Sequence, residues 1–261
     1  MNSEVFDEIK SFESCTLCPR KCKVNRLGKE TGACHADAQM RAARAALHFW
    51  EEPCISGQEG SGAVFFSGCA LGCVFCQNTD ISRGQEGEVI SIDRLAQICL
   101  NLQAQGANNI NLVTAGHYVP AVAESLRRAK ARGLTIPVVY NSSGYETPHT
   151  LQLLEGLVDI YLPDMKYMDT QLAKQYSHAE DYPDVAKEAL AEMVRQCPVC
   201  EFDERGIMKK GVIVRHLLLP GHVRNSKEVL AYLYETYRDQ IYISIMSQYT
   251  PVQQIKKYPE L

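Results

Sequence analysis

The chain has 261 residues, of which 46% are hydrophobic, and a formal net charge of -4. This length allows one large domain or two small ones with a substantial core. The slightly acidic balance excludes the broad basic surface of a nucleic-acid-binding protein. The longest apolar runs, such as Ile241 to Ile245, are too short to span a membrane, and Met-Asn-Ser-Glu is not a secretory signal. We therefore expect a soluble, cytoplasmic protein with no nucleic-acid or membrane partner.

The eleven cysteines form three groups, and Cys54 and Cys99 stand apart from them. The groups are Cys15, Cys18, Cys22 and Cys34, then Cys69, Cys73 and Cys76, then Cys197 and Cys200. In a reducing compartment such cysteines are more often metal ligands than disulfides. Because residues 1–55 carry few long apolar runs, we predict a small metal-binding leader at 1–55 and a main domain at 56–261.

The four leader cysteines are enough to saturate one metal site. Zinc in a closed site of four thiolates and a second, fully ligated iron-sulfur cluster both fit Cys15, Cys18, Cys22 and Cys34, and four free thiols are the third alternative. A saturated metal indicates a structural or electron-relay role rather than a reactive one.

The main domain alternates short apolar runs with segments of helical period. The predicted strands are 62–67, 109–114, 136–141, 157–162, 212–219 and 240–246, and the predicted helices include 92–105, 120–132, 148–155, 184–195 and 226–238. Ser91 is placed to cap the first of these helices, and Gly106 and Gly133 to end the first two. Strands that alternate with helices form right-handed crossovers, so we predict an α/β fold, a partial TIM barrel of (β/α)6 type. A doubly wound open sheet is the alternative.

A C-x3-C-x2-C motif directly follows the first predicted strand. Cys69, Cys73 and Cys76 can bind three irons of a 4Fe-4S cluster and leave the fourth iron open to an exogenous ligand, as a reactive metal site requires. Gly68 and Gly72 let the backbone wrap closely around such a cluster. Zinc or buried thiols are the alternative, but no fourth ligand for zinc follows closely.

This loop resembles the signature of the radical S-adenosylmethionine superfamily. The stretch from Gly60 to Cys69, with Cys76-Gln-Asn, is most similar to activating enzymes of glycyl radical enzymes, in particular the uncharacterised proteins related to pyruvate formate-lyase activating enzyme. The resemblance implies a 4Fe-4S cluster and S-adenosylmethionine as cofactors, an electron donor such as flavodoxin or ferredoxin, and cleavage to methionine and a 5′-deoxyadenosyl radical. No ferredoxin-like insertion follows Cys76, unlike in many of these activating enzymes.

Polar residues follow the predicted strands, at the end where barrels of this type place their active sites. The segments are Thr114 to His117, Asn141 to Gly144, Pro163 to Lys166, Arg215-His216, Pro220 to His222 and Ser247 to Tyr249. Each one alone has an ordinary explanation as a turn or a helix start. Their recurrence at successive strand ends predicts a single site.

The resemblance assigns roles to several of these residues. Thr114 and Gly116 occupy the place of a glycine-rich motif that receives the amino group of S-adenosylmethionine, although the usual acidic residue and proline are missing. Phe75 matches an aromatic side chain that packs near the adenine. Gln248 or Tyr249 would lie near the ribose.

Further roles concern the carboxylate of S-adenosylmethionine. Asp164 and Lys166 match an Asp-x-Lys pattern beside this carboxylate, where the aspartate helps to hold a monovalent cation. Asn141 and Ser142 fall where another cation ligand would lie. Arg215 resembles an arginine that contacts the carboxylate region, a task that suits the planar fork of a guanidinium.

The remaining chemistry-bearing residues stay open at this stage. Cys197-Pro-Val-Cys200 can complete a metal site or be redox active. The histidines without zinc-like pairing are His117, His149, His178 and His222, and we expect them to be surface or substrate-side groups. The chain ends at Tyr258-Pro-Glu-Leu without a predicted closing helix, so we expect part of the barrel floor or substrate face to be formed differently from longer relatives.

Three functions fit these features. The first is a radical enzyme, an oxidoreductase, that abstracts hydrogen from a protein, in the simplest case from a glycine of a glycyl radical enzyme. The second is a radical enzyme that modifies a peptide or a small molecule. The third is a non-catalytic iron-sulfur or zinc protein. We expect the first.

Overall fold

A curved sheet forms the centre of the molecule. The computed structural model describes residues 11–261, so the first ten residues of the predicted leader lie outside the described residues. Six strands run parallel in the order β2-β4-β5-β6-β8-β9. Their bounds are β2 Ser61–Phe66, β4 Ile110–Val113, β5 Val138–Ser142, β6 Ile160–Pro163, β8 Met208–Leu217 and β9 Tyr242–Met246. All six lie on the predicted runs, and the predicted α/β partial TIM barrel is confirmed.

Three further strands extend the sheet in antiparallel fashion. They are β1 (Arg41–His48) on β2, β3 (Glu88–Val89) on β1 and β7 (Glu201–Phe202) on β8. Strand β1 was not predicted, because its sequence RAARAALH is rich in helix formers and its pairing with β2 overrides that preference. The sheet therefore begins before the predicted boundary at residue 55.

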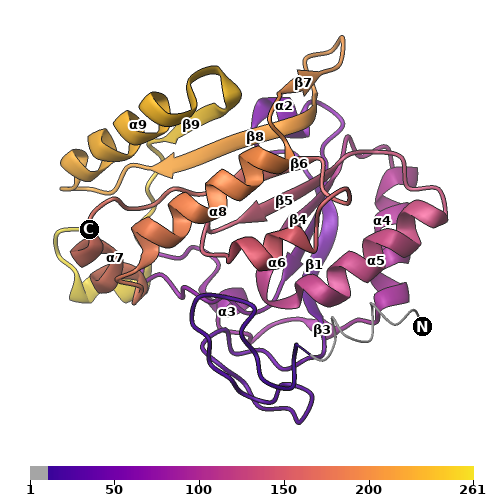
Figure 1. The fold of residues 1–261 in the computed structure, drawn as a ribbon, viewed down its shortest axis with the longest axis horizontal. Coiled ribbons are helices and arrows are strands. Elements are labelled where there is room, and N and C mark those ends of the chain that lie inside the picture. The colour runs from indigo at the N-terminus through magenta and orange to yellow at the C-terminus, as the bar shows by residue number, and fades with distance from the viewer. Residues whose placement is uncertain (1–10) are drawn as a thin grey trace.

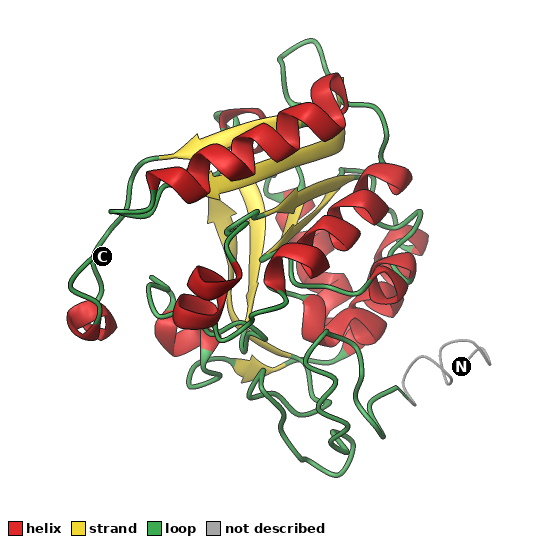
Figure 2. Ribbon diagram, turned by 60° about the vertical axis from the view of Figure 1, so that its left-hand side comes forward, coloured by secondary structure: helices red, strands yellow, loops and turns green. Residues whose placement is uncertain are grey.

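Helices surround the outside of the curved sheet (Figure 2). The five predicted helices are present as α4 (Ile92–Ala104), α5 (Val119–Ala131), α6 (Pro148–Gln152), α8 (Tyr182–Gln196) and α9 (Val223–Tyr237). The predicted cap of α4 is also present, since the Arg94 amide donates to Ser91 Oγ at 3.1 Å. The unpredicted helices are α2 (Pro53–Ser56), α3 (Thr79–Ser82) and α7 (Thr170–Ser177). Three short 3₁₀ segments cover Gly116–Tyr118, Arg238–Gln240 and Gln253–Lys257.

The two faces of the sheet are packed differently. Alternate side chains on the outer face, such as Leu112 and Tyr161, join the main core with the helices. The inner face forms a separate small core near the start of the strands, whose members are Val139, Ile160, Leu162, Met208 and Ile213 together with Ile55 of α2. Among the described residues the inner face is thus covered only by the short α2, whereas a doubly wound sheet carries helices on both faces.

The leader lies against one end of the barrel, next to α3 (Figure 1, indigo). Residues 11–40 contain neither helix nor strand. Phe12, Cys15 and Leu17 form a small buried cluster of their own. A guanidinium also lies inside it, because Arg26 is only 1% exposed and donates to the carbonyls of His117 at 2.6 Å and Asp37 at 2.7 Å. None of the helices in residues 11–261 has the length and apolarity needed to cross a membrane.

Candidate functional site

The three-cysteine loop, residues 67–78, connects β2 to α3. Gly68 has φ +98°, and a Cβ atom there would lie 2.5 Å from the Cys34 carbonyl oxygen, so the leader and the loop touch at a position that only glycine fits. Backbone N–H groups of Leu71 and Gly72 donate to the Cys69 sulfur. Ser177 Oγ donates to the Cys73 sulfur at 3.0 Å. Burial raises the pKa of the Cys69 and Cys73 thiols, and these hydrogen bonds offset part of the rise because they favour the thiolate.

Two other segments hold this loop in place. The Val74 amide donates to the carbonyl of Tyr176 in α7 at 2.9 Å. Arg20 of the leader donates from Nε to the Ala70 carbonyl and from Nη2 to the Ser177 carbonyl, each at 3.0 Å. Its remaining nitrogen donates to the carbonyl of His178. A single leader arginine thus fastens the loop to the end of α7.

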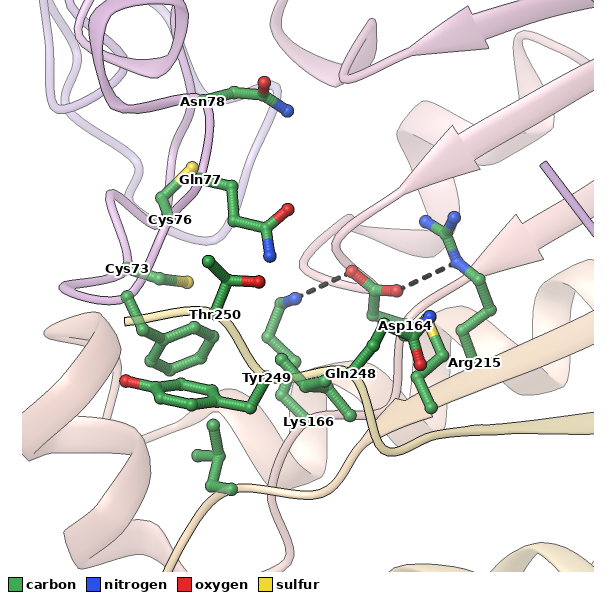
Figure 3. Close-up of a pocket in the computed structure, with 14 residues that line it drawn as sticks. Cys73, Cys76, Gln77, Asn78, Asp164, Lys166, Arg215, Gln248, Tyr249 and Thr250 are labelled. Carbon is green, nitrogen blue, oxygen red and sulfur yellow. Dashed lines mark hydrogen bonds and ion pairs between the residues drawn. The ribbon is translucent and has the colours of Figure 1, made fainter. Parts of the chain in front are cut away.

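A pocket of about 270 Å³ opens between the loop and the strand ends. The lining residues come from the loop, from the segment after β6, from β8 and the segment after it, and from the end of β9 and the segment after it. They are Cys73, Phe75, Cys76, Gln77, Asn78, Asp164, Lys166, Arg215, Leu217, Leu219, Met246, Gln248, Tyr249 and Thr250. Figure 3 shows Cys73 and Cys76 on one side of this pocket, and Asp164 and Arg215 on the other. The structure therefore brings these predicted residues together.

A pair of cations surrounds the Asp164 carboxylate. Lys166 Nζ lies 2.7 Å from Oδ2, and Arg215 Nε lies 3.1 Å from Oδ1 (Figure 3). Burial alone would raise the pKa of the Asp164 carboxyl, but the two cations more than offset this and lower it. Burial disfavours the charged form of Lys166, yet the Asp164 carboxylate raises the pKa of that ammonium overall. All three groups are therefore charged at neutral pH.

A family model described as the radical SAM superfamily matches residues 63–233, which contain the loop, the pocket's cations and most of the barrel. The chain belongs to the radical SAM superfamily. An uncharacterized protein of Methanocaldococcus jannaschii is 29% identical to this chain over 257 residues. The match covers 96% of this chain and 70% of that protein.

Solved structures show more distant likenesses. Methylornithine synthase (PylB) is 14% identical with a TM-score of 0.49, over 70% of this chain and 52% of that one. HydG, a maturase of the FeFe-hydrogenase, is 12% identical with a TM-score of 0.48, over 74% of this chain and 44% of that one. The chain thus spans about half, or less, of the length of these two proteins.

Membership of the radical SAM superfamily implies a 4Fe-4S cluster and S-adenosylmethionine, and the donor set fits them. The three thiols come from one loop, those of Cys69 and Cys73 receive hydrogen bonds, and Cys73 and Cys76 line the pocket. Within residues 11–261 no group of three or more His, Cys, Asp or Glu side chains is arranged to hold a single metal ion. A 4Fe-4S cube takes its thiolates on separate irons, so its ligands do not have to converge on one point.

A second, much smaller cavity of about 20 Å³ lies beside Cys69. Thr114 and Gly116 line it, and Thr114 has φ +60°, a strained conformation for a β-branched residue. Glu146, which the sequence did not indicate, also lines this cavity and is 6% exposed. Burial raises the pKa of the Glu146 carboxyl to about 8, so this group carries a proton at neutral pH.

Two residues predicted to bind a cation bond to other protein groups instead. Ser142 Oγ donates to Glu146 Oε2 at 3.1 Å. Asn141 accepts from Arg215 Nη2 at 2.6 Å and donates to Glu51 at 3.1 Å. Since both oxygens of Asp164 already accept from cations, a monovalent cation on that carboxylate would compete with Lys166.

The four leader thiols line one cavity of about 10 Å³. Arg26 Nη1 donates to the Cys15 sulfur at 3.7 Å, and the Ala33 amide donates to the Cys22 sulfur at 3.4 Å. Backbone amides also donate to the sulfurs of Cys18 and Cys34. Burial raises the pKa of the Cys18 thiol to about 12. In the leader, unlike the loop, the sulfurs point into a space about the size of one water molecule.

Other predicted residues lie away from both thiol groups. Cys197 is buried and Cys200 is half-buried, and Cys200 packs with Cys54 against the inner core at the barrel floor. The prediction for His117 was wrong, because this ring is buried and its Nε2 lies 2.8 Å from the Ser67 carbonyl oxygen. Burial lowers the pKa of His117 to about 3, so the ring is a neutral packing group.

Proposed function

We propose that this protein cleaves S-adenosylmethionine reductively and uses the product radical to abstract a hydrogen atom. The observation that carries the proposal is the pocket in which Cys73 and Cys76 face the half-buried cations Lys166 and Arg215. When bound at Cys69, Cys73 and Cys76, the 4Fe-4S cluster would pass one electron to the sulfonium, giving methionine and a 5′-deoxyadenosyl radical.

The residues of the pocket have separate tasks in this proposal. Lys166 is the cation best placed to attract the methionine carboxylate, because Asp164 holds its ammonium at the pocket. Outside this pocket, beside Cys69, the strained turn at Thr114, with Gly116, offers backbone groups to the amino group. Phe75 and Tyr249 provide apolar surface for the adenosine and keep water from the reacting carbon.

Arg215 has a more restricted task than the resemblance suggested. Each of its three nitrogens already donates to a protein acceptor, namely Asp164, Glu51 and Asn141. We assign it mainly to the orientation of Asp164, with a contact to the ligand carboxylate through its remaining N–H bonds. Asn141 and Ser142 belong to the same supporting layer.

For the substrate, a glycine of a glycyl radical enzyme is our first proposal, and it rests on the sequence resemblance. The alternative is a peptide or small molecule, for which the same pocket would serve. An electron donor such as flavodoxin or ferredoxin completes the reaction in either case.

For the leader we propose a single structural metal ion, zinc, on Cys15, Cys18, Cys22 and Cys34. The space of about 10 Å³ that the four thiols line is closer in size to one ion than to a cube of irons and sulfides, although the thiols do not yet converge on one point. Binding would draw the four sulfurs together and stabilise a segment that lacks regular secondary structure.

The test is anaerobic reconstitution with iron and sulfide, followed by incubation with S-adenosylmethionine and dithionite. The expected product is 5′-deoxyadenosine, together with methionine. A fully loaded protein that forms no 5′-deoxyadenosine would refute the enzyme proposal. If cleavage occurs, a glycyl radical signal in an enzyme encoded by a neighbouring gene would support the first substrate class. The absence of this signal would favour the alternative.

A further inference from the structure

The connection between β1 and β2 enters the lower end of the barrel. Helix α2 inserts Ile55, which has no exposed surface, into the inner core. Two side-chain amides fix this turn, since Asn109 Nδ2 donates to the Ile55 carbonyl at 2.7 Å and Asn108 Nδ2 donates to the Ser56 carbonyl at 2.8 Å. The residues just before α2 are therefore held rigidly beneath the pocket.

One of these residues, Glu51, points its carboxylate into the barrel. Oε2 accepts from Asn111 Nδ2 at 2.8 Å and from Asn141 Nδ2 at 3.1 Å, and Oε1 accepts from Arg215 Nη1 at 3.0 Å. Only 11% of the Glu51 side chain is exposed. The carboxylate thus gathers donors from β4, β5 and β8, three separate strands of the sheet.

This carboxylate completes the hydrogen bonding of Arg215. The Arg215 guanidinium donates from Nε to Asp164, from Nη1 to Glu51 and from Nη2 to Asn141. Without Glu51, Nη1 would lose its acceptor in a site where the Arg215 side chain is only 15% exposed. A guanidinium with little access to water would then reorient towards the nearest carboxylate, which here is Asp164, and form two parallel hydrogen bonds with it.

Such a turn would disturb the pocket, because Asp164 Oδ2 is the acceptor that holds Lys166. Two carboxylates, Glu51 and Asp164, bond to the cations Arg215 and Lys166, and Glu52 adds a further negative charge that acts on Arg215. Removing the charge of Glu51 takes away the carboxylate that bonds directly to Arg215 Nη1 and weakens the negative charge below the pocket. Asp164, Lys166 and Arg215 line the pocket, whereas Glu51 lies one layer beneath it.

The geometry points to Glu51 as a positioning residue for S-adenosylmethionine, one that acts through Arg215 and Asp164 on the orientation of the Lys166 ammonium. This inference rests on the proposed function. Glu51 would touch neither the cofactor nor the substrate. Its effect should therefore appear in the affinity for S-adenosylmethionine and depend on the presence of Arg215.

The test combines Glu51→Gln, Arg215→Gln and the double variant. Equilibrium binding of S-adenosylmethionine to the reconstituted, unreduced proteins should be weakened roughly tenfold by Glu51→Gln, because a charge-assisted hydrogen bond is lost. The double variant should bind no more weakly than Arg215→Gln alone, since both changes break the same chain of contacts. Iron and sulfide content should stay at the native level in all three, a readout that does not depend on turnover.

Glu52→Gln is the matched control, with the same loss of charge one residue along. Glu52 accepts from Ser244 Oγ of β9 at 3.0 Å and acts on Arg215 through its charge, whereas Glu51 adds a hydrogen bond to that guanidinium. The affinity of Glu52→Gln for S-adenosylmethionine should therefore change less than twofold. Glu51→Asp keeps the charge and is the second variant if Glu51→Gln does not fold, with an expected loss smaller than that of Arg215→Gln.

The role of Glu51 would be overturned if Glu51→Gln bound S-adenosylmethionine with native affinity, or if the effects of the two substitutions on this affinity were fully additive. The proposed function would stand in both cases. Failure of the native protein to bind S-adenosylmethionine would overturn the proposed function, and the role of Glu51 with it. The two failures are therefore distinguished by the native protein.

Discussion

The two cysteine groups that meet at Gly68 are built for different purposes. In the loop, Cys73 and Cys76 line a pocket of about 270 Å³ with cations on its far wall. In the leader, four thiols surround a space of about 10 Å³ that is lined by sulfur, apolar groups and Arg26. The number of thiols matters less than what lies opposite them. A group that opens on a charged pocket is placed to react with a ligand, whereas for the group that closes on itself we propose a structural ion.

The largest expected effect concerns the reactive side of this comparison. Cys73→Ala should reduce formation of 5′-deoxyadenosine to background, because it removes one of three ligands of the proposed cluster. The measurement is product analysis with parallel iron and sulfide assays. Cys200→Ala, which changes a thiol at the barrel floor, is the control and should retain both. Turnover by Cys73→Ala would show that the cluster is held elsewhere.

The second prediction tests the closed group. Cys22→Ala alters the exposed thiol of the leader, and it should remove the leader's metal ion and lower the thermal midpoint by roughly 5–10 °C. Cleavage of S-adenosylmethionine should persist below the new midpoint. Metal analysis and thermal unfolding measure the first two outcomes. A variant with native stability and no activity would instead indicate that the leader relays electrons.

The third prediction concerns the cavity of about 20 Å³ between the two groups, which Cys18, Cys69 and Glu146 line. Burial raises the pKa of Glu146 to about 8 from an ordinary value of 4.5. The folded protein therefore keeps a proton that the unfolded chain releases, so the contribution of Glu146 to stability is full below about pH 4.5 and falls as the pH rises to about 8.

Glu146→Gln carries no titrating proton at this position. Its stability should therefore not fall through this effect as the pH rises from about 4.5 to 8. Urea unfolding at pH 5 and pH 9 should show the variant gaining roughly 3 kcal/mol relative to the native protein between the two values. Glu124→Gln, on the outer helix α5, serves as the control. Parallel pH profiles for Glu146→Gln and the native protein would mean that Glu146 is ionised in the fold.

The smallest effect is expected from Ser177→Ala. Ser177 Oγ donates to Cys73 at 3.0 Å, and hydrogen bonds to a ligating sulfur stabilise the more negative, reduced cluster. Loss of a bond of about 1 kcal/mol should lower the reduction potential by on the order of 50 mV for one electron. Anaerobic redox titration measures this shift. An unchanged potential would place the cluster away from the Cys73 sulfur.

Strong local signals explain how much of this molecule the sequence predicts. The six parallel strands are short apolar runs, largely buried except in β9, and α4 carries both its Ser91 cap and its Gly106 stop. Strand β1 has no such signal, because its alanines and arginines would suit a helix equally well. Helix α7 escaped prediction since its eight residues are too few for a clear period.

The supporting residues of the site were beyond sequence reasoning for a different reason. Asp164, Lys166 and Arg215 follow or lie within predicted strands, so strand order was enough to bring them together. Glu51 lies 164 positions from Arg215 along the chain, and its neighbours Glu52 and Glu59 look the same in the sequence. What distinguishes Glu51 from the other two glutamates is the turn that carries the β1–α2 connection under the sheet.

The hydrogen bonds that Arg20 makes to the loop and to α7 also have a consequence for biosynthesis. Its acceptor at Ser177 lies 157 residues downstream, and a ribosome takes roughly 8–30 s to add a stretch of that length. Throughout this interval the leader has been made but cannot yet be fastened to the loop and α7. Its cysteines therefore meet the cell's metals and oxidants before the barrel exists to shelter them, and an early-bound ion would guard them until α7 is complete.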